Sequence, residues 1–133
     1  MRDIKFRAWC PSTNIMYVSG CLDLLLHFDG KLQALQESGL IVGTYNVPPM
    51  EVMQFTGLTD KNGKEIYEGD VVRTSITFEV STLPHMGEVV YCEEYGSFGT
   101  RNDAGITLFV HHCVNTREVI GNIYETPELL STP

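Results

Sequence analysis

Apolar and polar residues alternate in short runs along this 133-residue chain, and turn-forming residues separate the runs. In the first run, Ile4, Phe6 and Ala8 alternate with Lys5 and Arg7. A period of two residues is typical of a strand with one face in the core. Similar patterns predict further strands over residues 15–18, 22–28, 31–35, 51–58, 65–67, 71–80, 87–92, 106–114 and 118–124. We therefore expect a mainly β protein with many short strands.

Three stretches between these strands favour connectors or loops. Residues 46–49, Asn-Val-Pro-Pro, predict an extended connector because proline disfavours helix at and before its own position. Residues 81–86 predict an exposed loop, and residues 96–105, with three glycines, predict a mobile loop or a wide hairpin. We place a boundary in the connector, with an N-terminal β-lobe over 1–48 and a small barrel over 49–133. One compact unit is the alternative.

Paired turn residues mark hairpins within this pattern. Asp29-Gly30 lies between the predicted strands 22–28 and 31–35, so we favour a hairpin there, and a helix over 22–35 is the alternative. Asn62-Gly63 predicts a type I′ hairpin turn, because both central residues of that turn need positive φ.

A second turn and a helix end complete the predicted elements. Glu68-Gly69-Asp70 predicts a glycine-marked turn, after which β-branched residues begin the next strand. Near the C-terminus, Thr126 and Pro127 predict the N-cap and first residue of one short helical turn.

The composition is that of a globular protein outside a membrane. The chain is 43% hydrophobic and 20% charged, and no apolar stretch approaches the roughly 20 residues that a bilayer requires. Its first residues alternate charged and apolar side chains and show no apolar signal-peptide core. We therefore expect a cytoplasmic protein with no membrane contact.

The net charge of −8 makes nucleic acid an improbable partner. Phosphate contacts need clustered lysine and arginine, and the chain has one small basic cluster, Arg2, Lys5 and Arg7. The acids are dispersed, which is typical of a solvated surface. The alternative is an acidic face that engages a basic partner or mimics the charge of DNA.

Residues that could carry chemistry are few. The four cysteines show no C-x-x-C pair and are interpreted as free thiols. His111 and Cys113 share one strand face, which makes them weak metal candidates, and we expect no metal site and no cofactor. Glu65, Glu68 and Asp70 place three carboxylates near one turn, which we interpret as an exposed acidic turn rather than an acid–base pair.

Two aromatic residues are the best candidates for partner contacts. Most aromatic residues fall at alternating strand positions, where packing in the core is expected. Tyr95 and Phe98 instead fall in or beside the glycine-rich stretch, where a ring is hard to bury. We predict that these two rings are exposed and available for contact.

Four segments in order resemble the YopX family of small proteins carried by phages and prophages of Gram-positive bacteria. They are residues 4–9 (IKFRAW), 53–73 (MQFTGLTDKNGKEIYEGDVVR), 87–91 (GEVVY) and 119–130 (VIGNIYETPELL). Members usually carry asparagine where this chain has Thr126. The resemblance implies an SH3-type β-barrel in the C-terminal part, preceded by an N-terminal β-lobe. The family motif defines no catalytic residues, and the motif residues Asn62, Gly63, Gly69 and Asp70 are expected to be structural.

The leading hypothesis is a non-enzymatic phage or prophage accessory protein of the host bacterial cytoplasm that acts through protein contacts. We expect a homo-oligomer, because sheet edges need covering and residues 40–42 and 47–50 are more apolar than a connector needs. The partner's identity does not follow from the sequence. The alternatives are a nucleic-acid-associated regulatory factor and, third, an enzyme or metalloprotein.

Overall fold

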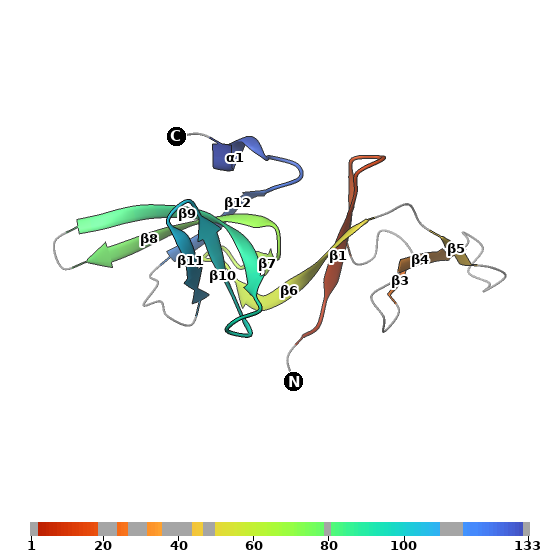
Figure 1. The fold of residues 1–133 in the computed structure, drawn as a ribbon, viewed down its shortest axis with the longest axis horizontal. Helices are drawn as coiled ribbons and strands as arrows, with labels where there is room; N and C mark the ends of the chain where they lie inside the picture. The colour runs from red at the N-terminus through yellow and green to blue at the C-terminus, as the bar shows by residue number, and fades with distance from the viewer. Residues whose placement is uncertain are drawn as a thin grey trace. The chain divides into compact units, whose positions relative to one another are not determined.

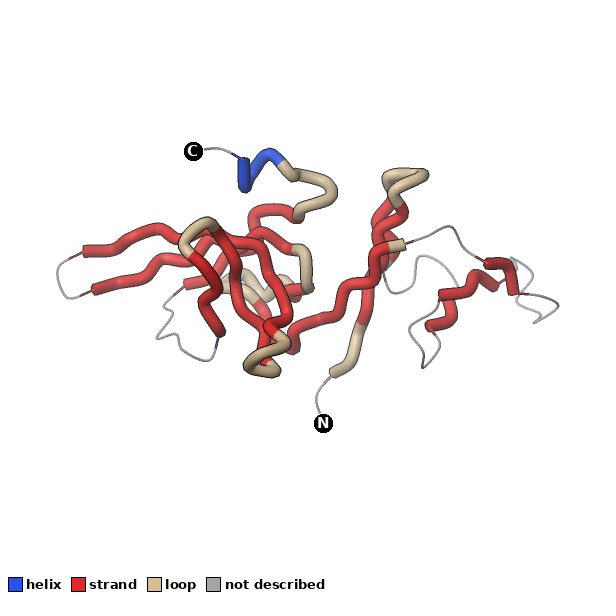
Figure 2. The backbone as a smooth tube through the Cα atoms, in the orientation of Figure 1, coloured by secondary structure: helices blue, strands red, loops and turns tan. Residues whose placement is uncertain are grey.

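The structure is a computed structural model that describes residues 3–18, 24–26, 32–35, 44–46, 50–78, 81–109 and 116–131. Within these ranges nearly every element is a strand (Figures 1 and 2), and the expected mainly β class is confirmed. The elements are β1 (Phe6–Cys10), β2 (Ile15–Tyr17), β3 (Leu24–Leu26), β4 (Leu32–Leu35), β5 (Thr44–Asn46), β6 (Glu51–Thr59), β7 (Glu65–Tyr67), β8 (Asp70–Phe78), β9 (Ser81–Cys92), β10 (Ser97–Asn102), β11 (Gly105–Leu108), β12 (Thr116–Asn122) and α1 (Glu128–Ser131).

The chain forms two compact units, and β6 passes from one to the other. The N-terminal unit is Lys5–Met53, and the C-terminal unit comprises Met1–Ile4 and Gln54–Pro133. The expected domain boundary between residues 48 and 49 stays a prediction.

The N-terminal unit contains two sets of antiparallel strands. β1 pairs with β2, and the turn between them places Asn14 at φ 54° with its N–H donated to the Cys10 carbonyl at 2.8 Å. β3, β4 and β5 form a three-stranded sheet in chain order. The hairpin of β3 and β4 confirms strands rather than a helix in this region. Asn46 ends β5 and is not part of a connector, because pairing with β4 extends these three residues.

Burial in β1 does not follow the expected alternation. Ile4 is 63% exposed and Phe6 39% exposed, whereas Ala8, Trp9 and Cys10 are buried in succession. Neighbouring residues of a strand point to opposite faces, so both faces of β1 are covered near its C-terminal end. The prediction of one core face through residues 4–8 is therefore wrong.

The main sheet of the C-terminal unit has five strands in the order β11-β10-β9-β8-β12. Its longest pairing joins β8 and β9 over all of β8 except Asp70, from Val71 opposite Glu88 to Phe78 opposite Ser81 (Figure 2). The expected loop at 81–86 is therefore wrong. Pro84 is tolerated there because the register of β9 with β10 ends at Glu88, which leaves β9 as an edge beyond that residue.

The glycine-rich stretch 96–105 is also mostly strand. Residues 97–102 form β10, which pairs with β9 on one side and β11 on the other, so of the two predicted alternatives the mobile loop is wrong, and β10 and β11 form a hairpin. A Cβ atom at Gly99 would lie 2.5 Å from the Thr107 carbonyl oxygen. This glycine therefore permits close approach of two strands and does not mark a flexible segment.

The core of the C-terminal unit is built on this sheet and on β7. Ile66, Val72, Val89 and Phe109 form a buried cluster, and the partly buried Phe98 packs against it. These residues come from four strands and the segment after β11, so the cluster depends on long-range pairing.

The C-terminus carries the expected short helical turn, α1. The Thr126 hydroxyl donates to the Asn122 carbonyl and accepts the Asn122 N–H, both at 3.0 Å. Gly121 lies against Thr126 and Leu129, with no room for a Cβ atom. Thr126 thus fastens the turn to the end of β12. Across the described residues no helix has the length and apolar character needed to cross a membrane.

Candidate contact site in the C-terminal unit

The turn between β6 and β7 is built around the carboxylate of Asp60. Oδ1 accepts the N–H groups of Asn62 at 2.8 Å and Lys64 at 2.9 Å. The Gly63 N–H binds the Asp60 carbonyl at 3.0 Å, and Gly63 has φ +81°. Asn14 is the one non-glycine residue with positive φ in the described part of the chain, so Asn62 does not have it. The turn is therefore a type I turn followed by a left-handed glycine, and the type I′ prediction is wrong.

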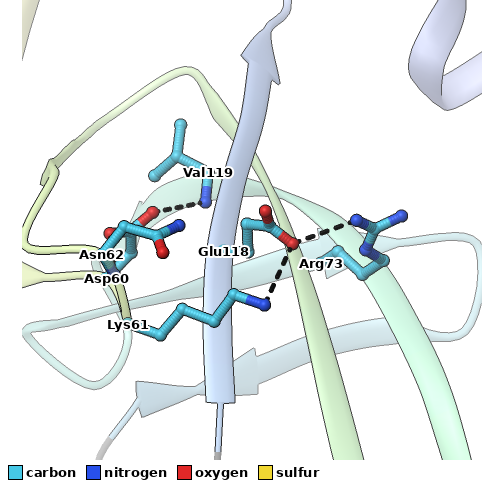
Figure 3. A network of polar contacts seen from close by, with 6 residues as sticks. All are labelled: Asp60, Lys61, Asn62, Arg73, Glu118 and Val119. Atoms are coloured by element: carbon cyan, nitrogen blue, oxygen red, sulfur yellow. Dashed lines mark hydrogen bonds and ion pairs between the residues drawn. The ribbon is translucent and has the colours of Figure 1, made fainter.

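Asp60 also fastens this turn to β12 (Figure 3). Its Oδ2 accepts the Val119 N–H at 3.0 Å, and the Lys61 N–H binds the Arg117 carbonyl at 2.9 Å. Asp60 is 7% exposed. Burial opposes its ionisation, but the three backbone N–H donors outweigh burial and hold its pKa below the usual range. The Asp60 carboxylate thus has a structural role: it binds three backbone N–H groups, two in its own turn and one in β12.

An ion-pair cluster lies on the outer side of the same contact. Glu118 Oε2 lies 3.0 Å from Arg73 Nη2 and 3.4 Å from Lys61 Nζ (Figure 3). The hydrogen bond from Arg73, followed by the charge of Lys61, lowers the pKa of Glu118. Water reaches these side chains, so we expect a small contribution to stability.

The second turn buries a residue that we expected at the surface. Gly69 has φ +82°, and Asp70, 1% exposed, accepts the Tyr67 N–H on Oδ2 at 2.8 Å. The Gly69 N–H binds the Val89 carbonyl, and the Gly69 carbonyl accepts the Ile123 N–H, both at 2.9 Å. The interpretation of an exposed acidic turn is therefore wrong at Asp70. Its buried carboxylate stabilises the turn by accepting the Tyr67 N–H.

An open hollow of about 420 Å³ lies beside this turn, and we name it the aromatic hollow. Its lining residues are Gln54, Glu68, Tyr91, Gly96, Ser97 and Phe98. Tyr91 lies directly opposite Phe98 across β9 and β10, and the two rings meet edge to face with centroids 5.2 Å apart. Glu68 Oε1 accepts the Gln54 N–H at 2.8 Å, which fixes this carboxylate in the wall.

The two predicted contact rings differ in exposure. Tyr95 is 66% exposed in the turn between β9 and β10. Phe98 is half-buried, because strand β10 points one side of its ring toward the core. Sequence reasoning missed Tyr91, which is 47% exposed. Its strand position was visible, but its pairing with Phe98 depends on the register of β9 and β10.

The other predicted site residues lie elsewhere. Lys5 and Arg7, at the start of β1, are half-buried, and Arg2 lies outside the described residues. His111 and Cys113 also lie outside them. No group of three His, Cys, Asp or Glu residues suited to a metal ion occurs in the ranges that the structure describes. Cys10 and Cys92 are free and buried, as expected for structural thiols, while Cys21 and Cys113 lie outside the described residues.

A second hollow, of about 550 Å³, lies beside α1, and we name it the helix-side hollow. Its lining residues are Met86, Glu88, Arg101, Asn102, Asp103, Ala104, Leu129 and Leu130. Glu88 and Arg101, which are opposite each other on β9 and β10, form an ion pair at 3.1 Å in its lining. With Asp103 as a third charged residue, this hollow has charges of both signs in its lining, unlike the aromatic hollow.

The fold and its turns can now be compared with known proteins. The family model described as YopX protein matches residues 5–131. The chain belongs to the YopX family. The segments 53–73 and 119–130, in which the sequence resembles the family, contain the turn of Asp60 and Gly63, the turn of Gly69 and Asp70, and the terminal turn of Thr126.

Two solved structures resemble the chain over nearly its full length. Protein EF1440 from Enterococcus faecalis shares 27% identity with a TM-score of 0.64, covering 98% of this chain and 99% of that one. Protein yopX from Bacillus subtilis shares 25% identity with a TM-score of 0.64 and the same coverage. The comparison with curated proteins finds no match.

Proposed function

We propose that this YopX-family protein is a non-enzymatic accessory protein that acts by binding a segment of another protein in the aromatic hollow. The observation that carries the proposal is the exposed ring of Tyr91, set against Phe98 in an open hollow beside the exposed Tyr95. Tyrosine rings offer large contact area at low cost in side-chain entropy and dominate many protein interfaces. A phage or prophage origin and a place in the host cytoplasm belong to the same proposal.

The carboxylates near the turns support a binding role over catalysis. Asp60 and Asp70 are buried and accept backbone N–H groups. A general acid or base must exchange protons with a substrate, and a carboxylate held in this way is stabilised in its charged form. These side chains hold two turns in shape, and the turn of Asp70 lies beside the hollow.

We also propose that the C-terminal unit is an SH3-type barrel. Support comes from its five-stranded antiparallel sheet, the short hairpin of β6 and β7, and the terminal turn of helix. Such barrels commonly bind extended segments on an aromatic face, which agrees with a binding role.

Site-specific photo-crosslinking tests the binding role. A photoreactive phenylalanine analogue replaces Tyr95 in one variant and Asp103, in the helix-side hollow, in a matched control. We expect position 95 to give a defined crosslinked adduct with another protein in the host bacterium and position 103 to give none. Adding the change Tyr91→Ser should abolish the adduct. An adduct that survives Tyr91→Ser, or equal adducts from both positions, would remove the aromatic hollow from the proposal.

A further inference from the structure

We propose that the aromatic hollow binds a lysine- or arginine-bearing segment, with the cationic side chain against the ring of Tyr91. This inference rests on the proposed function and names the chemistry of its partner. The acidic residues that would attract such a basic partner are those in and beside the aromatic hollow.

The first argument is the geometry of the rings. A cation is attracted to the face of an aromatic ring, and the attraction is larger where the ring is partly shielded from water. Tyr91 is 47% exposed and its ring is held at 70° to that of Phe98. The ring is therefore both accessible and fixed, which a cation-binding surface requires.

The second argument is the space beside Tyr91. A Cβ atom at Gly96 would lie 3.6 Å from the Tyr91 hydroxyl oxygen, so any longer side chain there would narrow the hollow. Gly96 has φ +61°, a conformation that glycine adopts without strain. Glycine at this position thus leaves the space beside the Tyr91 hydroxyl free of a side chain of the turn.

The third argument is charge. Among the described lining residues, Glu68 is the one that carries a charge, and it is negative. The turn that borders the hollow also carries the exposed Glu93 and Glu94, and the whole chain has a net charge of −8. This field attracts a cationic segment and repels phosphate groups. In the helix-side hollow, by contrast, Arg101 adds a positive charge beside Glu88 and Asp103, which repels a cationic segment.

Nuclear magnetic resonance of the full chain tests the inference directly. The probe is a hexapeptide of alternating glycine and lysine, blocked at both ends, and its control is the same peptide with every lysine acetylated. We expect the lysine peptide to shift the backbone amide signals of Gly96 and Ser97 in a saturable manner. The acetylated peptide should leave those signals in place, and the signals of Asn102 and Asp103 should not move with either.

Matched variants separate a specific site from general charge attraction. Tyr91→Leu keeps an apolar side chain but removes the ring, and we expect about two- to fivefold weaker binding of the lysine peptide. The control Phe6→Leu removes an exposed ring in the other unit and should not change binding. Glu94→Gln should weaken binding more than Asp103→Asn, although both remove one negative charge.

Each other outcome overturns the inference. Equal shifts with the acetylated peptide would show that charge is irrelevant, and the proposed binding role would survive. Equal losses in Glu94→Gln and Asp103→Asn would show non-specific attraction. Saturable shifts of Gly96 and Ser97 with a six-nucleotide single-stranded DNA would identify a different partner class. If position 95 crosslinks a protein but the lysine peptide moves no signal, the inference alone fails.

Discussion

At the scale of single residues, buried carboxylates hold this protein's turns in shape. Asp60 uses both oxygens to bind backbone N–H groups of its own turn and of β12, and Asp70 binds Tyr67 across the next turn. Each replaces a missing backbone partner in a tight turn, which is a common role for aspartate. Because such bonds are buried and charge-assisted, each contributes more than a surface ion pair does.

We predict that Asp60→Asn lowers the free energy of unfolding by about 1–3 kcal/mol, because an amide nitrogen cannot accept an N–H where an oxygen did. Denaturation in urea measures the change. Asp103→Asn, at an exposed turn position, is the control and should change stability by no more than about 0.5 kcal/mol. Equal stability of both variants would show that the Asp60 bonds do not matter.

The same carboxylate makes stability depend on pH. The pKa of Asp60 is lowered in the folded chain, so the unfolded chain binds a proton first as pH falls. Its contribution is fully present above the unfolded pKa of about 3.9 and is lost as pH falls through the lower folded value. Urea denaturation between pH 6 and pH 3 should show a smaller loss of stability in Asp60→Asn than in the original chain. A parallel loss in both would contradict the assignment.

At the scale of elements, glycines set the turns and allow close contact between strands. Gly63 and Gly69 have positive φ, where a side chain is strained whatever the surrounding space. Gly99 serves a different purpose, since its backbone lies against that of β11. Sequence reasoning treated all of these glycines as turn or loop signals, and that was right for the first two and wrong for Gly99.

We predict that Gly63→Val and Gly69→Val each lower the melting temperature, because a β-branched residue at positive φ costs at least about 1–2 kcal/mol. Gly63→Asn is the matched control, since asparagine tolerates this conformation, and should lower it less. Thermal unfolding followed by circular dichroism provides the measurement. Unchanged melting in both valine variants would show that these turns do not determine the fold.

Gly99→Ala tests the close approach of β10 and β11. The added Cβ atom would press on backbone atoms of Thr107 and Leu108, which have no flexible end to move aside. We expect faster hydrogen exchange of the β11 amides than in the original chain, with β8 less affected. Gly105→Ala is not a suitable control, because its φ of +121° strains any side chain. Ser97→Ala, at the start of β10, adds no atom to the sheet and should leave exchange unchanged.

At the scale of the whole molecule, the main sheet ends in two strands, β12 and β11, and an end strand is where a second copy of the chain can associate. β12 is bordered by the turn of Asp60, which binds the Val119 N–H and the Arg117 carbonyl. β11 ends the sheet order on the other side and carries the 47% exposed Ile106. An exposed edge strand is a template for pairing with a second chain.

We therefore propose a homo-oligomer that associates through β11, and size-exclusion chromatography with light scattering measures it. We expect a mass at least twice the 14.9 kDa of one chain at micromolar concentration, and Ile106→Lys should reduce it. A monomer in the original chain would remove the proposal. The apolar residues 40–42 and 47–49, which also suggested association, lie outside the described residues.

Local signals in the sequence were sufficient for some parts of this protein. The mainly β class, the positions of the turns at Gly63 and Gly69, the strand 65–67 and the terminal helical turn all follow from residues close together in the chain. So does the family, because its long matching segments are these same turns. Local φ preferences and short-range hydrogen bonds determine such features, and neighbouring residues encode both.

Tertiary structure alone decided the features that depend on distant partners. Pairing with β8 makes residues 81–86 a strand, β11 approaches Gly99 too closely for a side chain, and β12 donates the Val119 N–H to Asp60. Tyr91 faces Phe98 only in the register of β9 and β10, so the aromatic hollow has no local signal. Strand pairing joins backbone groups far apart in sequence, and every residue except proline carries the same backbone N–H and C=O groups. For this physical reason the side-chain pattern of the sequence indicates which residues form strands, but it does not determine which strands pair, and that pairing creates the aromatic hollow.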